Sequence, residues 1–286
     1  MNEAIPTDDG IYPSISDVKY HADRRSLSSS GASILLKPGG PARFREAMDN
    51  PPKPKRQYDF GHAAHKFVLG EGEEIVPVDA VDWRTKAAQE QRASAHAEGK
   101  IPLLRAEVET AMLMADKVAA HPVAGPLFAL GQAEQSLYVV DPETGVRLRA
   151  RPDWVVQDDR LTIVDFKTAV DGGAHTPVFE RKAFEYNYHL QMAWYITVAQ
   201  LLGYETPAFL FVVAEKAAPY LVNVIELDAE YFAIGRDSMR EAVRIYRDCT
   251  ESGLWPGYPA IIHSGAPPAY AYSRATIADL IEQETA

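Results

Sequence analysis

The most informative stretch of this chain is Arg151-Pro-Asp-Trp-Val-Val-Gln-Asp-Asp-Arg-Leu-Thr-Ile-Val-Asp-Phe-Lys167. Two runs rich in Val, Ile, Leu and Trp flank a short polar segment at residues 157–160, and this pattern predicts a β-hairpin in a buried sheet. The hairpin also carries charge, because Asp153 opens its first strand while Asp165 and Lys167 close its second. Charged side chains at the ends of buried strands predict a site as well as a core element.

The charges of this hairpin can be assigned to faces of the sheet. Asp165 and Lys167 are two residues apart, so they point to one face, and Phe166 points to the other. Two crowded carboxylates repel each other unless a divalent cation binds between them, and Mg²⁺ prefers oxygen ligands. A lysine beside that cation can hold or deprotonate an attacking water. Strand ends also carry Asp and Lys as solvated residues, so the other motifs must decide between the two interpretations.

Length and composition place the chain among ordinary globular proteins. Its 286 residues, 47% hydrophobic and 24% charged, fit one large domain or two small ones. No apolar run reaches the length of a membrane span, and the N-terminal residues lack the features of a signal peptide, so we expect a cytoplasmic protein. Because Cys249 is the single cysteine, the sequence excludes an intrachain disulfide, a Cys₄ zinc site and a cysteine-held iron–sulfur cluster.

Charge is distributed unevenly along the chain. The net charge of −11 argues against a protein that coats nucleic acid with its whole surface. Between Lys19 and Lys66, however, ten Lys or Arg stand against four Asp or Glu, whereas residues 200–286 hold six against twelve. A basic N-terminal face could hold a polyanion in one groove. A solvated basic face without a ligand is the equal alternative.

The N-terminal part of the chain predicts mainly helices. Ser28, Ser29 and Ser30 are typical helix caps, so we assign them no chemistry. Leu104, Val108, Met112, Ala115 and Val118 follow a helical spacing and are expected to form a core stripe. The expected order is an extended arm at 1–27, short helices at 28–36 and 41–48, a loop at 50–56, and helices at 60–69, 85–99 and 103–121.

The helix at 60–69 carries His62 and His65 three residues apart, hence on adjoining faces. It lacks the acid of the His-Glu-x-x-His motif of zinc proteases. A histidine in a helix is most often a satisfied core or surface residue. His65 therefore becomes a candidate site residue only if this helix packs against the hairpin.

The C-terminal half predicts an α/β sandwich around a mixed sheet, with the helical N-terminal region placed against it. Glu134, at the start of the first expected strand, is either a further carboxylate of the site or an exposed edge residue. Gln191 and Tyr195 are four residues apart and share one helix face. The expected elements are a three-stranded meander at 134–140, 146–156 and 161–167, a helix at 177–202, strands at 209–214 and 221–227, and a helix at 229–249.

Four short motifs follow one another in an order known from a single enzyme superfamily. They are Gly61…His65, Asp153, Asp165-Phe166-Lys167 and Gln191…Tyr195. Together they resemble the RecB-like branch of the PD-(D/E)xK nuclease superfamily. Within that branch the chain is most similar to the nuclease domain of RecE (exonuclease VIII) and its phage relatives. The resemblance covers residues 10–260 and includes the runs Tyr20-His21-Ala22, Leu27–Ser30, Pro41–Phe44, Phe60–His65 and Arg151–Trp154.

The resemblance implies an α/β fold with a restriction-endonuclease-like core, a mixed central sheet and flanking helices. One nuclease domain is expected at residues 28–260, with a helical part at 28–130 and the sheet core at 131–260. Residues 1–27 would form an extended N-terminal arm, and residues 261–286 a C-terminal tail.

The activity implied by the resemblance is that of a Mg²⁺-dependent exodeoxyribonuclease. Such an enzyme hydrolyses linear double-stranded DNA from 5′ to 3′ and leaves a 3′ overhang for phage-type recombination by strand annealing. The resemblance further implies two metal ions per active site, with Mn²⁺ able to substitute, a homo-oligomeric ring, and a single-strand annealing protein as partner, but no membrane. An endonuclease or repair nuclease on the same fold, and a non-catalytic DNA-binding subunit, are the alternatives.

The resemblance also implies roles for individual residues. The expected metal ligands are His65, Asp153, Asp165 and the backbone carbonyl of Phe166. The expected catalytic residues are Lys167, Asp165, Asp153, Glu134, Gln191 and Tyr195. The expected DNA contacts are Arg43, Lys53, Lys55, Arg56 and Arg151.

Overall fold

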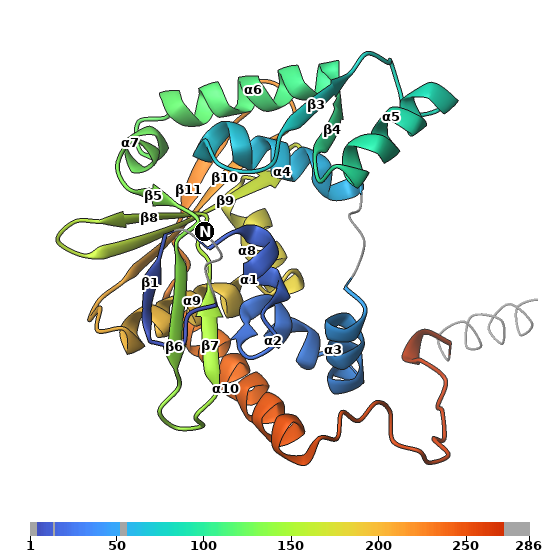
Figure 1. Cartoon of the computed structure of the whole chain (residues 1–286), viewed down its shortest axis with the longest axis vertical. Coiled ribbons are helices and arrows are strands. Elements are labelled where there is room, and N and C mark those ends of the chain that lie inside the picture. The colour runs from blue at the N-terminus through green and yellow to red at the C-terminus, as the bar shows by residue number, and fades with distance from the viewer. Residues whose placement is uncertain (1–4, 14, 52–55, 272–286) are drawn as a thin grey trace, which may run out of the picture.

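A mixed five-stranded sheet forms the centre of the protein. The computed structural model describes residues 5–13, 15–51 and 56–271. The strands of this sheet are β5 (Gln132–Ala133), β8 (Trp154–Gln157), β9 (Leu161–Ala169), β10 (Ala208–Glu215) and β11 (Val222–Ile225). Their order is β11-β10-β9-β8-β5, with β9 parallel to β10 and the other neighbours antiparallel (Figure 1). The predicted mixed central sheet is thereby confirmed.

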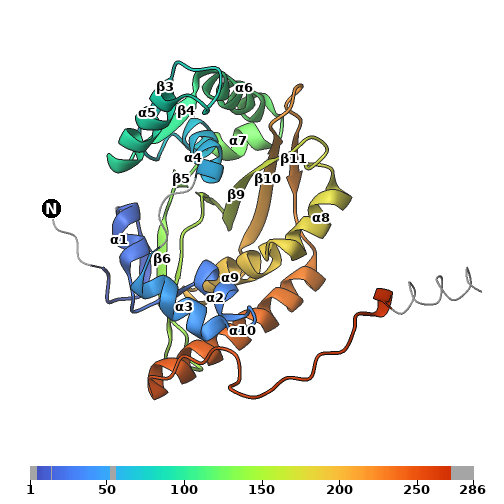
Figure 2. The same cartoon turned by 90° about the vertical axis from the view of Figure 1, so that its right-hand side faces the viewer.

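Helices cover both faces of this sheet (Figure 2). The helices on one face are α8 (Thr176–Glu185), α9 (Tyr188–Leu201) and α10 (Ala229–Ser252), and those on the other are α4 (Arg56–Leu69), α6 (Arg105–Ala120) and α7 (Ala124–Ala129). Each face has its own apolar core. Ile163 and Phe211 belong to the core under α9 and α10, whereas Phe166 and Val212 belong to the core under α4 and α6. The predicted α/β class is confirmed.

The charged hairpin is present as β8 and β9, which pair antiparallel with Trp154 opposite Val164. Side chains alternate along β9 as the sequence predicts. Phe166 is fully buried in the core under α4 and α6, and Asp165, one residue earlier, points to the face covered by α9. The hairpin therefore carries Asp165 to the inside of the molecule, where its exposure is 1%.

A second sheet receives the strands that precede the hairpin. Its members are β1 (Gly10–Tyr12), β2 (Leu27–Ser28), β6 (Ser136–Val140) and β7 (Arg147–Ala150), in the order β1-β6-β7-β2. The predicted three-stranded meander with one strand at 146–156 is therefore wrong, because the chain changes sheets between Ala150 and Trp154. Pro152 has no backbone N–H and cannot continue a ladder. Asp153 is thus placed in a corner between two sheets.

The helix predicted at 177–202 is interrupted, and this prediction is wrong as well. The helix is interrupted between α8 and α9 at Asn187, whose φ of 58° is in the left-handed region. Asparagine tolerates this region better than most residues, and its side-chain amide donates a hydrogen bond of 2.9 Å to Ser33 Oγ. The break turns Tyr188, the first residue of α9, toward the site described below.

The N-terminal segment differs from the extended arm expected at residues 1–27. It contains β1, a short helix α1 (Asp17–Ala22) and β2. Tyr20 is 5% exposed, because the guanidinium groups of Arg149 and Arg151 lie over its ring at 5.1 and 4.0 Å. Long-range packing of cations against an aromatic ring holds this segment on the body. The two expected short helices follow as α2 (Ser29–Leu35) and α3 (Gly40–Asp49).

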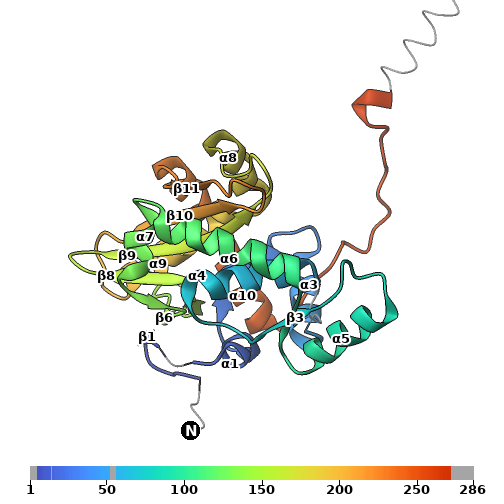
Figure 3. The same cartoon turned by 90° about the horizontal axis from the view of Figure 1, so that it is seen from above.

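A small peripheral unit contains two strands that were not predicted, together with the helix expected at 85–99. In it β3 (Ile75–Val78) pairs parallel with β4 (Ile101–Leu104), and α5 (Lys86–Ala97) connects them. Because residues 101–104 form a strand, the helix expected at 103–121 begins only at Arg105. Figure 3 shows α5 and β3 at one end of the molecule.

The core stripe predicted for α6 is partly wrong. Met112 is 50% exposed, whereas Ala111, Met114 and Val118 are the buried residues of this helix. Ala111 lies in the same apolar cluster as Ala64 of α4, and two small residues allow helices to approach closely. Val118 is the member of the predicted stripe that is buried in the helix.

The chain after α10 leaves the body. Trp255 still stacks on Phe44 at a centroid distance of 5.5 Å, and the carbonyl of Pro256 accepts a hydrogen bond of 3.2 Å from the N–H of Ala42. Beyond Tyr258, which lies near Gly39, the chain runs away from the other elements up to residue 271 (Figures 1 and 2). Part of the expected tail at 261–286, residues 272–286, lies outside the described residues. Within the described residues, no helix combines the length and the apolar character needed to cross a membrane.

Candidate active site

Asp153 lies in the corner between β7 and β8, where it is fixed by the second strand of the hairpin. Its Oδ2 accepts a hydrogen bond of 2.8 Å from the backbone N–H of Phe166. Burial raises the pKa of Asp153, and the Lys167 ammonium opposes this shift. The corner thus holds one carboxylate at a defined place beside Asp165 and Lys167.

Asp165 is the most enclosed charged group of the site. Its Oδ1 accepts a hydrogen bond of 2.7 Å from Gln191 Nε2, and its Oδ2 is in close contact with the ammonium of Lys167. Among the described residues, no donor is aligned for a regular hydrogen bond with this Oδ2 atom, which is fully buried. The carboxylate is therefore held from one side by an amide and from the other by a charge alone.

The protonation of this pair follows from burial and charge. Burial raises the pKa of Asp165 to about 6, although the Lys167 ammonium lowers it. Burial also acts to lower the pKa of Lys167, but the carboxylates of Asp165 and Asp153 outweigh it and leave the pKa raised. Lys167 also lies over the ring of Tyr188 at 5.0 Å. A charged lysine is suited to hold water or phosphate rather than to deprotonate water.

His65 is brought to the hairpin by α4, which meets the condition set by the sequence. Its ring lies edge-on to Phe166 with centroids 5.2 Å apart, and its Nδ1 is 3.6 Å from Asp153 Oδ2. Burial, assisted by the Lys167 ammonium, lowers the pKa of His65 to about 4. The imidazole is therefore neutral near pH 7, so its contact with Asp153 is not an ion pair. A ring nitrogen of a neutral imidazole can coordinate a metal cation.

Glu134 and Tyr195 complete the set of predicted catalytic residues. The backbone N–H of Glu134 donates to the carbonyl of Asp153 at 3.1 Å, and burial raises the pKa of its carboxyl group. Glu134 is partly buried beside Asp153. Tyr195 donates its hydroxyl hydrogen bond to the carbonyl of Arg151 at 3.0 Å. Tyr195 thus supports the corner between the sheets, and among the described contacts it does not touch the carboxylates directly.

A cavity of about 530 Å³ opens at this corner. Asp153, Glu134, Gln191 and Tyr195 reach its wall, while Asp165 stays behind Gln191. Sequence reasoning missed the opposite wall, which is formed by Asp17, Tyr20, His21, Ser28, Ser29, Ser30, Ser33 and Lys37. The runs around Tyr20 and Ser28 contributed to the family resemblance, but no spacing signal connected them with the hairpin.

The side chains at this corner carry atoms that can coordinate a divalent cation. Asp153 and Asp165 supply hard oxygen donors, the Asp165 Oδ2 lacks an aligned hydrogen bond, and His65 is neutral. Within residues 5–13, 15–51 and 56–271, however, no three His, Cys, Asp or Glu side chains converge as a ready metal cage. The Lys167 ammonium currently supplies the positive charge beside Asp165.

Two of the predicted DNA contacts, Arg151 and Arg43, have described side chains, and both bind groups of the protein itself. Arg151 is 8% exposed in its side chain, and its guanidinium donates to Ser136 Oγ and to the carbonyl of Ile15 at 2.7 Å. Arg43 on α3 donates to the carbonyl of Pro38. The guanidinium of Arg151 thus links the N-terminal segment to β6. Of the other predicted contacts, Lys53 and Lys55 lie outside the described residues, and Arg56 is described only as the first residue of α4.

Comparison with known proteins identifies a family and a likeness of fold to solved structures. A family model described as "PDDEXK-like domain of unknown function (DUF3799)" matches residues 39–263. A solved structure of a "putative exonuclease" from Eubacterium rectale has a TM-score of 0.59 at 11% identity and covers 89% of this chain and 96% of its own. At this identity the likeness concerns the fold alone.

Other comparisons add little. The solved structure of SSO0001 aligns with 82% of this chain and 80% of its own length at 10% identity. Its TM-score of 0.33 is too low to indicate a shared fold. No curated protein matches the chain.

Proposed function

Because the chain belongs to the family of PDDEXK-like domains, and so to the PD-(D/E)xK superfamily, we propose that it is a metal-dependent exodeoxyribonuclease acting on linear duplex DNA. Family and fold support a nuclease. The finer part of the proposal rests on the resemblance to RecE-type domains. It comprises 5′ to 3′ hydrolysis and a 3′ overhang that is used in phage-type strand annealing.

One observation carries the proposal: Asp153, Asp165 and Lys167, together with His65 and Gln191, meet at one corner of the sheet. A purely structural role gains little from a carboxylate that is 1% exposed, because burying charge is costly. Placing such a carboxylate beside a lysine and a cavity is the arrangement expected of a hydrolytic site.

The metal ions would be Mg²⁺, with Mn²⁺ as a substitute, and two per site as the resemblance implies. Asp153, Asp165, the backbone carbonyl of Phe166 and His65 would hold them. Bound divalent ions supply charge stabilisation at a phosphate and a more acidic water.

The protein's own groups have separate tasks in this proposal. Lys167 holds the attacking water or a phosphate oxygen, since its raised pKa keeps it charged. Gln191 fixes the orientation of the Asp165 carboxylate through its hydrogen bond. Tyr195 fixes the corner that carries Asp153 by binding the carbonyl of Arg151. Glu134 adds a carboxylate at the cavity wall, next to Asp153.

The proposed substrate reaches Asp153 through the cavity. Its wall opposite the hairpin carries Lys37 and the hydroxyl groups of Ser29, Ser30 and Ser33. Ammonium and hydroxyl groups are common partners of DNA phosphates. A ring-shaped oligomer around DNA and a single-strand annealing partner remain part of the proposal on the resemblance alone.

The test is digestion of end-labelled linear duplex beside a covalently closed circle, with Mg²⁺ and with chelator. We expect Mg²⁺-dependent release of nucleotides from the linear DNA only. Cleavage of the circle identifies an endonuclease or repair nuclease instead. Binding of DNA without cleavage of either substrate, at every divalent ion tested, identifies a non-catalytic DNA-binding subunit.

A further inference from the structure

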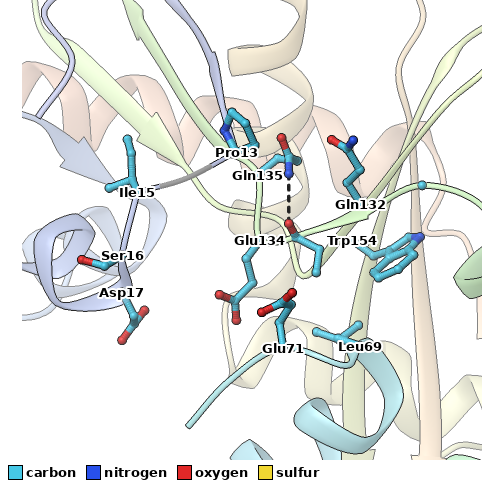
Figure 4. A pocket seen from close by; sticks show the side chains of 12 residues that line it. Pro13, Ile15, Ser16, Asp17, Leu69, Glu71, Gln132, Glu134, Gln135 and Trp154 are labelled. Carbon is cyan, nitrogen blue, oxygen red and sulfur yellow. Dashed lines mark hydrogen bonds between the residues drawn. The ribbon is translucent and has the colours of Figure 1, made fainter. Parts of the chain in front are cut away.

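A second cavity, drawn in Figure 4, lies beside the candidate active site and shares Glu134 with it. Its volume is about 530 Å³. The N-terminal segment, the end of α4, β5 and Trp154 of β8 form its walls. Glu134 and Asp17 line this cavity and also the cavity at the hairpin corner. The two cavities are therefore neighbours that share a wall.

Residues that line the second cavity are close in sequence to the candidate metal ligands Asp153 and His65. Trp154 directly follows Asp153, and the N–H of Glu134 donates to the carbonyl of Asp153 at 3.1 Å. Leu69 stands four residues after His65, so both lie on one face of α4. The segments that carry two of the candidate metal ligands, His65 and Asp153, thus also contribute residues to the wall of this cavity. A group bound there would lie next to a phosphate held at the corner.

The lining of the cavity excludes phosphate. Asp17, Glu71 and Glu134 contribute carboxylates, and Gln132 and Gln135 contribute amides. None of the described residues that line it is Lys, Arg or His. Figure 4 shows the Glu71 and Glu134 side chains among those that line the cavity. A negatively charged phosphate would be repelled, whereas an uncharged group with N–H donors would be attracted.

Two side chains indicate a flat ligand with hydrogen-bond donors. Trp154 donates its indole N–H to the carbonyls of Leu127 and Leu130 at 3.0 and 2.8 Å, so it offers the cavity its carbon surface. Gln135 is 6% exposed, and its amide nitrogen donates to the carbonyl of Ala133 at 3.1 Å. Its carboxamide oxygen adds a hydrogen-bond acceptor to the cavity wall, so a ligand with N–H donors suits this lining.

We propose that this cavity binds the nucleobase of the nucleotide next to the reacting phosphate. This inference rests on the proposed nuclease function and adds a binding subsite to it. A nucleobase is flat, uncharged and rich in N–H groups, and enzymes that receive a single base hold it by its polar edge and by aromatic or apolar contacts. The volume lies within the ordinary range of small-ligand sites.

The lining also predicts a preference among bases. Carboxylates and the Gln135 oxygen accept hydrogen bonds, and an exocyclic amino group supplies two N–H donors. Guanine, adenine and cytosine carry such a group, whereas thymine does not. The cavity therefore favours the first three bases over thymine.

Binding of a nucleoside tests the proposal without cleavage. The probes are 2′-deoxyguanosine and 2-deoxyribose, titrated into the full chain without metal and followed by saturation-transfer NMR. We expect 2′-deoxyguanosine to bind and 2-deoxyribose not to bind. Gln132→Ala should weaken nucleoside binding by about two- to tenfold, the range for one lost hydrogen bond. Gln132 is exposed at a strand edge, so this variant should fold. Gln200→Ala, an exposed glutamine on α9, is the matched control.

Equal binding of 2′-deoxyguanosine and 2-deoxyribose, or wild-type affinity in Gln132→Ala, would overturn the nucleobase site. Because no cleavage is measured, this result is independent of the test of the nuclease function. If the protein binds the nucleoside but cleaves no DNA, the nuclease function is refuted and the nucleobase site is supported. If it cleaves DNA but binds no nucleoside, the nuclease function is supported and the nucleobase site is refuted.

Discussion

The hydrogen bond between Gln191 and Asp165 gives the sharpest prediction about the site. Gln191→Leu removes this bond of 2.7 Å while keeping a side chain of similar size. Asp165 is 1% exposed, so water cannot readily take the place of the lost amide. A hydrogen bond to a charged group contributes about 1.5–3 kcal/mol. A partner that orients a metal-binding carboxylate typically affects metal affinity or activity by about 10–100-fold.

We therefore expect Gln191→Leu to lower kcat, or to raise the Mg²⁺ concentration needed for half-maximal activity, by about 10–100-fold. The assays are cleavage of linear duplex over a Mg²⁺ titration and chemical denaturation of the same preparation. Gln200→Ala, which changes an exposed glutamine near the end of the same helix, should leave both unchanged. If Gln191→Leu behaves like Gln200→Ala in both assays, the assigned role of Gln191 is refuted.

Two further substitutions test the support of the site and the role of the lysine. Arg149→Met should lower the free energy of unfolding by about 3–5 kcal/mol, because it leaves the buried carboxylate of Asp23 without the guanidinium that lies 3.7 Å away. A loss below about 1 kcal/mol in urea denaturation would contradict the proposed role of this ion pair in holding the N-terminal segment. Lys167→Met should keep divalent-ion binding in calorimetry but lower kcat by about 10²–10³-fold, the usual effect of removing one group that stabilises charge developing in the transition state. Loss of ion binding in this variant would show instead that the lysine acts on the metal site.

The hairpin could be predicted because its signal is local. Alternating apolar residues, a polar turn and the charges of Asp153, Asp165 and Lys167 all lie within one short stretch. The placement of Phe166 and Asp165 on opposite faces follows from the strand period and is found in the structure.

The errors arise where distant contacts outweigh local pattern. Residues 146–156 look like one continuous strand, and only Pro152 hints that the chain changes sheets there. The run around Asn187 contains neither Gly nor Pro, so Asn187 itself is the one local hint that α8 ends there. Tyr20 looks like a residue of a polar arm, yet the guanidinium groups of Arg149 and Arg151 bury it.

The site shows the same division between local and distant information. The residue types and spacings nominate His65 and Gln191, but their contacts with Asp153 and Asp165 depend on how α4 and α9 pack. The resemblance implies that Arg151 contacts DNA. In the structure its guanidinium binds Ser136 and the N-terminal segment, and no sequence spacing reveals these contacts.

The central claim is that Asp165 belongs to a hydrolytic site that acts on DNA. Its most direct test is digestion of linear duplex by the wild-type chain and by Asp165→Asn, purified side by side and assayed with Mg²⁺ and with Mn²⁺. Asp165→Asn keeps the shape of the side chain and an oxygen for Gln191, so the fold should persist in circular dichroism. We predict cleavage by the wild type and none by the variant with either ion. Cleavage that persists at the wild-type rate in Asp165→Asn, or a well-folded wild type that cuts no DNA with either ion, would contradict the claim.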